Sequence, residues 1–416
     1  MTQSQAPVSL KLLLPLLASI MAVSPFAIDL YLPAMPEIAL YLSTEMPAVQ
    51  NSLSIYLVGY AVGLLMFGPL ADKYPRRYLV LFGLIGFCIF TLALLLAQNI
   101  EQFIAIRFLQ AMVSSAATVV VPGTIREYYG KNTAKGLSYV SMIMMLAPMI
   151  APSIGSFFLF IHSWQAIFVA LTAYALIVLI LVAFYLPNAN ANSKGKLEQQ
   201  VDEGSVVTES PKPPTFLKRY KIVLSHSGAR MDLISSMMVS LAFFAYITAV
   251  PFIYMTVFGV NEYWFSILFA LTVMALMIAH FTNSRMVVRK GSRQMQRYGL
   301  TVAVISSVGL VTVNLMSLPL AFTIAFVLPL MGSISMIAVN TDAMVLQEFA
   351  EQSGTATAVI GVLRFGIGGL AGPILAIFYD GTAIPFSLLM ASSIMVVLVC
   401  QLIRYNTQER VLNKEL

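Results

Sequence analysis

The sequence has little charge, little cysteine and little histidine. Only 10% of its 416 residues are charged and 59% are hydrophobic, whereas about 25% of an ordinary soluble domain is charged. A soluble fold of this length needs more polar surface than these residues supply, which excludes a soluble enzyme, a disordered chain and a nucleic-acid-binding domain. The two cysteines and three histidines are scattered, so the sequence contains no disulfide framework and no cluster of metal ligands.

In place of polar surface, the sequence has twelve long apolar runs. A membrane-spanning helix needs roughly 20 mostly apolar residues, and each run meets this requirement. The predicted spans are 10–33, 48–70, 78–98, 102–124, 137–160, 164–186, 229–256, 262–282, 295–316, 320–345, 355–378 and 383–404. We therefore predict an all-α integral membrane protein with twelve transmembrane helices. A cleaved signal peptide is the alternative for the first run, but cleavage would break the even count.

Lysine and arginine mark alternate loops. Of the 24 Lys and Arg residues, Arg107 and Arg364 lie inside spans, and the others lie near the termini or in one set of loops. That set, called the basic end here, comprises 71–77, 125–136, 187–230 and 283–297. The remaining loops, called the neutral end, contain no Lys or Arg and lie around 34–47, 99–101, 161–163, 257–261, 317–319 and 379–382. Because cytoplasmic loops are enriched in Lys and Arg, we predict that the basic end and both termini face the cytoplasm.

The longest polar segment divides the chain into two halves. We predict an N-terminal six-helix bundle over 1–187, a cytoplasmic linker over 188–228 and a C-terminal six-helix bundle over 229–416. Within the linker, residues 216–224 form either a short amphipathic helix on the inner leaflet or plain solvated chain. Basic turns follow the second helix of each half, at 68–77 and 283–291, which favours two parallel, pseudo-symmetric repeats.

The first of these turns has the spacing Gly68-x-x-x-Asp72-x-x-x-Arg76-Arg77. Gly68 would let a neighbouring helix approach closely, and Asp72 would pair with Arg76 or cap a neighbouring helix. Such a charge cluster can latch the cytoplasmic side in one conformation and release it in another. The simpler interpretation is an ordinary basic turn. We predict a cytoplasmic gate, because the spacing occurs where the topology expects it and resembles the signature loop of the major facilitator superfamily.

Two charged residues lie at the same predicted depth in the first and fourth helices. Asp29 comes about five residues before the outer end of its span, and Arg107 about five residues after the outer start of its own, so both lie about 8 Å below the outer surface. A buried arginine needs an anionic partner or water. We predict a proton-coupling pair in which Asp29 carries the proton and Arg107 competes with it. A static salt bridge and two residues without contact are the alternatives.

The fifth span contains the pattern Ala147-Pro148-x-x-Ala151-Pro152-x-x-Gly155. Prolines four residues apart remove two helix hydrogen bonds on one face and bend the helix, and small residues allow tight packing against a partner. The pattern resembles the antiporter motif of drug-exporting major facilitators, with alanines where glycines are usual. A kinked packing helix is the alternative interpretation.

Several motifs together resemble the Bcr/CflA drug-resistance subfamily of the major facilitators. They are Ile28-Asp29-Leu-Tyr-Leu-Pro33 in the first helix, Asn283-Ser-Arg285 after the eighth, and Ser353-Gly354-Thr-Ala-Thr-Ala with Leu363-Arg364-Phe-Gly366 in the eleventh. Residues 96–103 with Arg107-Phe-Leu-Gln110 are also similar to the more distant multidrug transporter MdfA. The resemblance implies a bacterial inner-membrane drug:proton antiporter. The chain lacks the additional acid of MdfA about two turns before Asp29, which would leave Asp29 as the only proton carrier of the first helix.

Two more charges lie within the C-terminal spans. Asp342 is near the predicted cytoplasmic end of the tenth helix, and Arg364 is about nine residues into the eleventh. Their depths differ by about 7–9 Å, a distance that a long arginine side chain covers only if it snorkels. We interpret them as a packing or gating pair, with a second proton site as the alternative.

The substrate site is expected between the halves, near the membrane midplane. Candidate residues are Met142, Met145 and Ala147 in the fifth helix and, by the resemblance to MdfA, Phe243, Phe244, Tyr246 and Ile247 in the seventh. Methionine and aromatic residues suit a promiscuous apolar site, because thioethers repack and rings stack on flat cations.

The predicted function is proton-coupled multidrug efflux by alternating access. Export of an endogenous metabolite, such as a siderophore or an amino-acid derivative, is the alternative. A membrane enzyme is disfavoured because no side chains stand at catalytic spacing, and without a P-loop the chain does not itself hydrolyse ATP. The expected partners are a small-molecule substrate, protons and the lipid bilayer. We expect a monomer that uses the proton gradient as its energy source and needs no cofactor, metal or nucleic acid.

Overall fold

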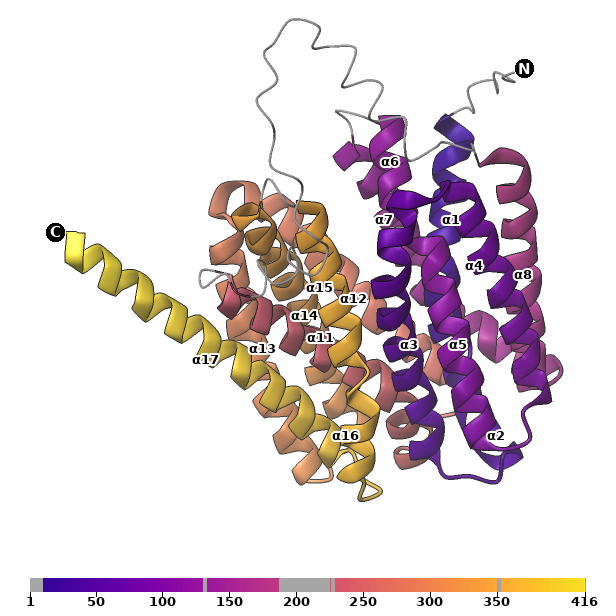
Figure 1. Cartoon of the computed structure of the whole chain (residues 1–416). Coiled ribbons are helices and arrows are strands. Elements are labelled where there is room, and N and C mark those ends of the chain that lie inside the picture. The colour runs from indigo at the N-terminus through magenta and orange to yellow at the C-terminus, as the bar shows by residue number, and fades with distance from the viewer. Residues whose placement is uncertain (1–9, 130–132, 187–224, 226–228, 350–352, 416) are drawn as a thin grey trace, which may run out of the picture.

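The computed structural model describes residues 10–129, 133–186, 225, 229–349 and 353–415. Within these ranges the regular structure is helical, and no strand occurs. The helices form two bundles, which lie side by side in Figure 1. Residues 216–224, for which an amphipathic helix was one expectation, lie outside the described part of the chain.

The first bundle holds the helices before the linker. They are α1 (Leu10–Asp29), η1 (Leu32–Ala34), α2 (Met35–Tyr41), α3 (Met46–Lys73), α4 (Arg76–Ala93), η2 (Leu94–Leu96), α5 (Ile100–Thr118), α6 (Val121–Tyr129), α7 (Thr133–Ile161) and α8 (Trp164–Tyr185). The second bundle holds α11 (Arg230–Pro251), η5 (Phe252–Val257), α12 (Glu262–Lys290), α13 (Ser292–Leu315), α14 (Leu320–Glu348), α15 (Ser353–Gly368), α16 (Ala371–Ile377) and α17 (Ile384–Glu415).

These helices confirm the prediction of twelve membrane spans in two six-helix halves. Within the described residues, eleven helical segments are long and apolar enough to cross a membrane, and α7 contributes the shorter apolar segment Leu146–Ile161. Some spans are broken where the sequence contains helix-breaking residues. Pro122 is the second residue of α6, directly after the break that follows α5, and Gly368 ends α15 with Gly369 between it and α16.

Each half is held together by its own helix packing. In the first half α5 packs against α3, α4 and α1, while α8 lies on α4 and α7 lies on α1. In the second half α14 packs against α11, α12 and α13, and α11 also contacts α15 and α17. The halves meet where α3 contacts α15 and α16, and where α7 contacts α12.

The contacts between the halves lie at the neutral end and in the middle of the molecule. Near the neutral end, the hydroxyls of Ser156 in α7 and Ser266 in α12 are 2.7 Å apart, and the amide of Gly372 in α16 donates to Ser54 Oγ of α3 at 2.8 Å. In the middle, the rings of Tyr60 in α3 and Phe365 in α15 lie 4.6 Å apart. The two bundles are therefore joined at the end whose loops carry no Lys or Arg.

Candidate functional site

The first helix breaks at Asp29. Pro33 follows four residues later and has no amide hydrogen to donate to the carbonyl of Asp29, so α1 ends at Asp29 and the chain re-forms as η1. The Asp29 side chain is only 4% exposed. It makes no hydrogen bond or ion pair with any residue that the structure describes. A carboxyl group without a partner is therefore buried at a helix end.

Arg107 of α5 is fully buried and binds this same helix end. One of its terminal nitrogens donates to the carbonyl oxygen of Ala27 at 3.0 Å, and the other donates to Gln110 Oε1 at 2.8 Å. Its guanidinium carbon lies 4.4 Å from the ring centroids of both Tyr31 and Tyr56. The last four carbonyls of a helix lack partners within the helix, so Arg107 caps the broken end of α1, where a cation also complements the helix dipole.

The predicted ion pair between Asp29 and Arg107 is absent from this conformation. None of the ion pairs among the described residues includes either side chain. The depth argument did bring Arg107 to the correct level of α1, because it contacts Ala27, two residues before Asp29. The guanidinium contacts a carbonyl, an amide and two rings instead of the carboxylate, and its Nε has no hydrogen-bond partner among the described residues. A role of the two residues in proton coupling stays a prediction.

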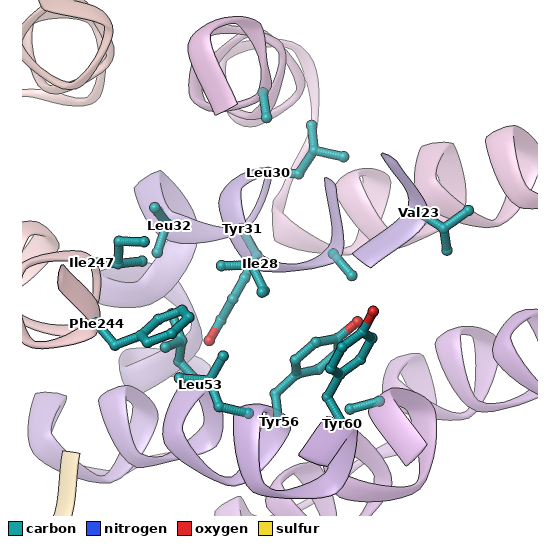
Figure 2. Close-up of a cluster of buried hydrophobic side chains, with 14 of the residues drawn as sticks. Val23, Ile28, Leu30, Tyr31, Leu32, Leu53, Tyr56, Tyr60, Phe244 and Ile247 are labelled. Atoms are coloured by element: carbon teal, nitrogen blue, oxygen red, sulfur yellow. The ribbon is translucent and has the colours of Figure 1, made fainter. Parts of the chain in front are cut away.

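Tyrosines extend the Arg107 site toward the other half. The Tyr56 hydroxyl lies 2.9 Å from Ser24 Oγ, and the Tyr60 hydroxyl lies 2.7 Å from Thr118 Oγ1. Figure 2 shows Tyr31, Tyr56 and Tyr60 together in one buried cluster. Since the Tyr60 ring also contacts Phe365, an aromatic path leads from the buried cation in one half to the other half.

The predicted binding residues of α11 divide into two groups. Phe244 and Ile247 extend from α11 toward this cluster (Figure 2), and the Phe244 ring lies 5.7 Å from that of Phe365. Phe243 packs edge-on against Phe244. Tyr246 points into its own half instead, where its hydroxyl lies 2.8 Å from Thr272 Oγ1. The structure thus brings Phe244 and Ile247 to the contact between the halves, with Phe243 beside Phe244 in α11.

The antiporter-like motif in α7 packs against the end of α1. Ala147 and Ala151 are buried, and a Cβ added to Gly155 would overlap the carbonyl oxygen of Leu30 and touch Pro33 at 3.0 Å. The small residue therefore allows α7 to lie directly on the chain that follows Asp29. Pro148 and Pro152 are inside the helix, as expected. The side chains of Met142 and Met145 lie outside the described part of the chain.

In the predicted gate, Arg76 forms an ion pair that the sequence did not suggest. Arg76 Nη1 donates to Glu127 Oε2 of α6 at 2.7 Å, and Arg77 donates to the carbonyl of Ala183 near the end of α8. The side chain of Asp72 lies outside the described part. Glu127 could have been noticed as the one acidic residue in an otherwise basic loop over 125–136.

The close helix approach predicted at Gly68 is wrong for this conformation. A Cβ added there would meet no described atom within 4 Å. The reason is geometric: α3 contacts α15 and α16 through its earlier residues, including Ser54, and this leaves its basic end uncovered. The neighbouring Met66 side chain is accordingly 50% exposed.

The second half contains the predicted charge pair and a second one that was missed. Arg364 of α15 forms an ion pair with Asp342 of α14, which confirms that the two side chains meet. In addition, Arg404 of α17 pairs with the fully buried Asp232 of α11 and lies 3.6 Å from Glu348 of α14. From the sequence, Arg404 counts only as one of the basic residues near the C-terminus. Among the described residues, no cluster of His, Cys, Asp and Glu suits a metal ion.

Comparisons with known proteins agree with this architecture. Residues 17–373 match the Major Facilitator Superfamily. The chain is 28% identical to a bicyclomycin resistance protein homolog of Haemophilus influenzae, over 89% of this chain and 90% of that one. It is 27% identical to a chloramphenicol resistance protein of Pseudomonas aeruginosa, over 85% and 84% of the two chains. The crystal structure of a bacterial homolog of the human lysosomal transporter Spinster, inward-facing and unoccupied, has a TM-score of 0.67 at 16% identity and covers 96% of each chain.

The predicted resemblance to drug-resistance transporters is thus confirmed. The superfamily match extends over most of the chain, from the first helix into α16, and the described residues contain eleven spanning segments and the shorter one of α7. The protein is accordingly a multi-span membrane transporter and not an enzyme. The chain belongs to the Major Facilitator Superfamily.

Proposed function

We propose that this transporter exports small lipophilic or cationic drugs across the bacterial inner membrane in exchange for protons. The names of its bicyclomycin- and chloramphenicol-resistance relatives support the substrate class. The observation that supports proton coupling is the buried Asp29 carboxyl, which has no partner among the described residues although Arg107 binds the same helix end.

The arrangement of the halves supports alternating access. Lys and Arg are concentrated at the basic end, which we assign to the cytoplasm together with both termini. The contacts between the halves lie at the neutral end and in the middle. With this orientation, the conformation is closed toward the outside. Rocking of the halves would close the basic end and open the neutral end.

Asp29 gains or loses its proton in this scheme according to which end is open. In the conformation seen here, an ionised Asp29 would be buried without a compensating charge or hydrogen bond. A proton taken up from outside would therefore stay on Asp29 as the outer end closes. A drug that enters from the cytoplasm would rearrange the cluster around Tyr31 and Tyr56, expose Asp29 to water and release the proton inward.

The membrane gradient is large enough to drive this exchange. One charge moving across 100 mV supplies about 2.3 kcal/mol, which supports a drug gradient of roughly fortyfold at about 1.4 kcal/mol per tenfold. A neutral drug exchanged for one proton would use this voltage. A monovalent cation exchanged for one proton would be electroneutral and would respond to the pH gradient alone.

Drug-induced proton release tests the proposal. Asp29→Asn keeps the size of the side chain and removes its titratable group. The purified wild-type protein in weakly buffered detergent solution should release protons when chloramphenicol or tetraphenylphosphonium is added. The Asp29→Asn variant should still bind the drug but release none, and proteoliposomes containing it should lose proton-driven export.

The matched control is Asp380→Asn at the neutral end. Asp380 is exposed and accepts two hydrogen bonds from Thr382, which an asparagine oxygen can also accept. This control should release protons as the wild type does. Release at wild-type stoichiometry from Asp29→Asn would show that another group carries the proton, and Asp342 would be the next residue to test.

A further inference from the structure

The ion pair between Asp342 and Arg364 joins three helices of the second half. Asp342 Oδ2 pairs with Arg364 of α15, and Asp342 Oδ1 accepts a hydrogen bond of 2.8 Å from Ser236 Oγ of α11. Both charged side chains are within membrane-spanning segments, yet they are partly exposed, at 22% for Asp342 and 34% for Arg364. Arg107 and Asp232, in contrast, are fully buried.

The exposed side of this pair lies on a face of α14 that is partly open among the described residues. Val339 precedes Asp342 by three residues and so shares its helix face. The Val339 side chain is 40% exposed. The helices that pack along α14 are α11, α12, α13 and α15, all from the same half. The face with Val339 and Asp342 is thus open to a ligand.

An aromatic cluster contains the residue next to Arg364 in the chain. Phe365 follows Arg364 in α15, and its ring lies 4.6 Å from that of Tyr60 and 5.7 Å from that of Phe244. These rings come from both halves of the transporter. Flat apolar groups stack on such rings, and cations are attracted to their faces. The contact between the halves therefore offers a surface for an apolar body, and the same segment of α15 carries the arginine that pairs with the accessible carboxylate.

The Asp342 carboxylate has capacity for a further donor. An ionised carboxylate has about four acceptor positions, and the described contacts of Asp342 are those with Arg364 and Ser236. A cation in an apolar setting needs a compensating charge. In the empty transporter Arg364 provides that charge, and its long flexible side chain can move away when another cation arrives.

We propose that Asp342 recognises the positively charged group of cationic substrates, which displace Arg364 from the carboxylate. This inference rests on the proposed drug-export function and names the residue that would select the charge of the drug. A neutral drug would use the aromatic rings without disturbing the ion pair. Arg364 would act as an internal competitor that keeps the site neutral when it is empty.

Two substitutions with opposite expected effects test the proposal. Binding of tetraphenylphosphonium, a lipophilic cation, and of chloramphenicol, a neutral drug, would be measured by titration calorimetry on the purified protein. Asp342→Asn should weaken binding of the cation about tenfold or more, because a contact to a charged group contributes about 1.5–3 kcal/mol and 1.4 kcal/mol is tenfold. Its chloramphenicol affinity should change less than about twofold. Arg364→Gln should bind the cation more tightly than the wild type, because the competitor is gone.

If the ion pair only stabilises the fold, the two substitutions should change drug binding and melting temperature in a different way. In that case both substitutions would weaken the binding of both drugs and lower the melting temperature together, which would overturn the inference. Asp342→Glu should restore cation binding, and Asp380→Asn at the neutral end should leave it unchanged. If Asp342→Asn does not fold, Arg364→Gln decides alone, since weaker or unchanged cation binding by that variant contradicts the competition.

The proposed function and this inference fail in distinguishable ways. A wild-type protein that binds and exports neither drug contradicts the drug-export function itself. A wild-type protein that binds both drugs, with Asp342→Asn binding the cation as tightly as the wild type does, contradicts only the role of Asp342. Proton release by Asp29 is measured separately and does not enter this comparison.

Discussion

Replacement of Arg107 by lysine tests how the transporter holds the end of its first helix. Lysine keeps the positive charge but lacks the planar, forked guanidinium. In the structure that group contacts two tyrosine rings at 4.4 Å each and donates to both Ala27 and Gln110. The lysine side chain is shorter and ends in a single ammonium group, so it cannot make all four contacts.

The free energy that Arg107→Lys should lose follows from these contacts. A cation–ring contact contributes about 0.5–2 kcal/mol, and a hydrogen bond from a charged donor about 1.5–3 kcal/mol. If Arg107→Lys forfeits one ring contact and part of one hydrogen bond, the loss is about 2 kcal/mol, which corresponds to about thirtyfold at 1.36 kcal/mol per tenfold. Export by proteoliposomes should fall by about that factor, and the melting temperature of the purified protein should decrease. Arg107→Ala should be more damaging still.

The tyrosine rings provide the matched control. Tyr56→Phe keeps the ring and removes only the hydroxyl that lies near Ser24, whereas Tyr56→Leu removes the ring. The Phe variant should behave nearly as the wild type, and the Leu variant should resemble Arg107→Lys. Wild-type export and stability in Arg107→Lys, or equal activity of the two Tyr56 variants, would refute the interpretation that the stacked guanidinium holds the helix end.

Further predictions concern the contacts around this site and at the two ends. Gly155→Ala should destabilise the protein and reduce export, because the added methyl overlaps the Leu30 carbonyl; Gly68→Ala, where no described atom lies within 4 Å, is the control in the same thermal melt. Glu127→Gln should reduce turnover at saturating drug while leaving affinity unchanged, because it removes the partner of Arg76 far from the drug; Asp72→Asn should have the same effect. Paired cysteines at Ser156 and Ser266, whose hydroxyls are 2.7 Å apart, should crosslink under oxidation and stop transport until a reductant is added. Normal export by the oxidised pair would show that the neutral end need not open.

The positions of the helices follow from the sequence because each depends on local composition. Twelve apolar runs and the alternation of basic loops fix most spans to within a few residues, as α8 (Trp164–Tyr185) shows against the prediction of 164–186. The helical span that starts at Glu262 continues to Lys290, well beyond the predicted end at 282, because polar residues at the basic end continue the helix. The break between α5 and α6 was missed although Pro122 marks it, because the apolar run continues across it. Hydropathy measures the transfer of side chains into lipid and is insensitive to the backbone hydrogen bonds that proline removes.

The partners of the buried charges were harder to predict, because they depend on how each helix is rotated about its axis. The interpretation of Asp342 and Arg364 as a pair is confirmed, although their depths along the helices were expected to differ by about 7–9 Å. The depth argument brought Arg107 to the level of Asp29 but not to its carboxylate, because the guanidinium faces the carbonyl of Ala27 and two tyrosine rings. Neutral groups that satisfy a cation leave no charge pattern in the sequence, so only the packed structure identifies them.

The distribution of polar contacts favours movement of the two halves as rigid bodies. Every ion pair among the described residues lies inside one half, including Arg76 with Glu127 in the first and Arg404 with Asp232 in the second. The described polar contacts between the halves are hydrogen bonds of serine hydroxyls and backbone groups, as between Ser156 and Ser266. Removal of one partner from a buried ion pair, such as Arg404 with Asp232, costs about 3–5 kcal/mol, whereas a neutral hydrogen bond contributes only about 0.5–1.5 kcal/mol and can be exchanged for one to water. Opening of the neutral end therefore breaks the weaker contacts and leaves the stronger ones intact, so each bundle keeps its shape while their relative orientation changes.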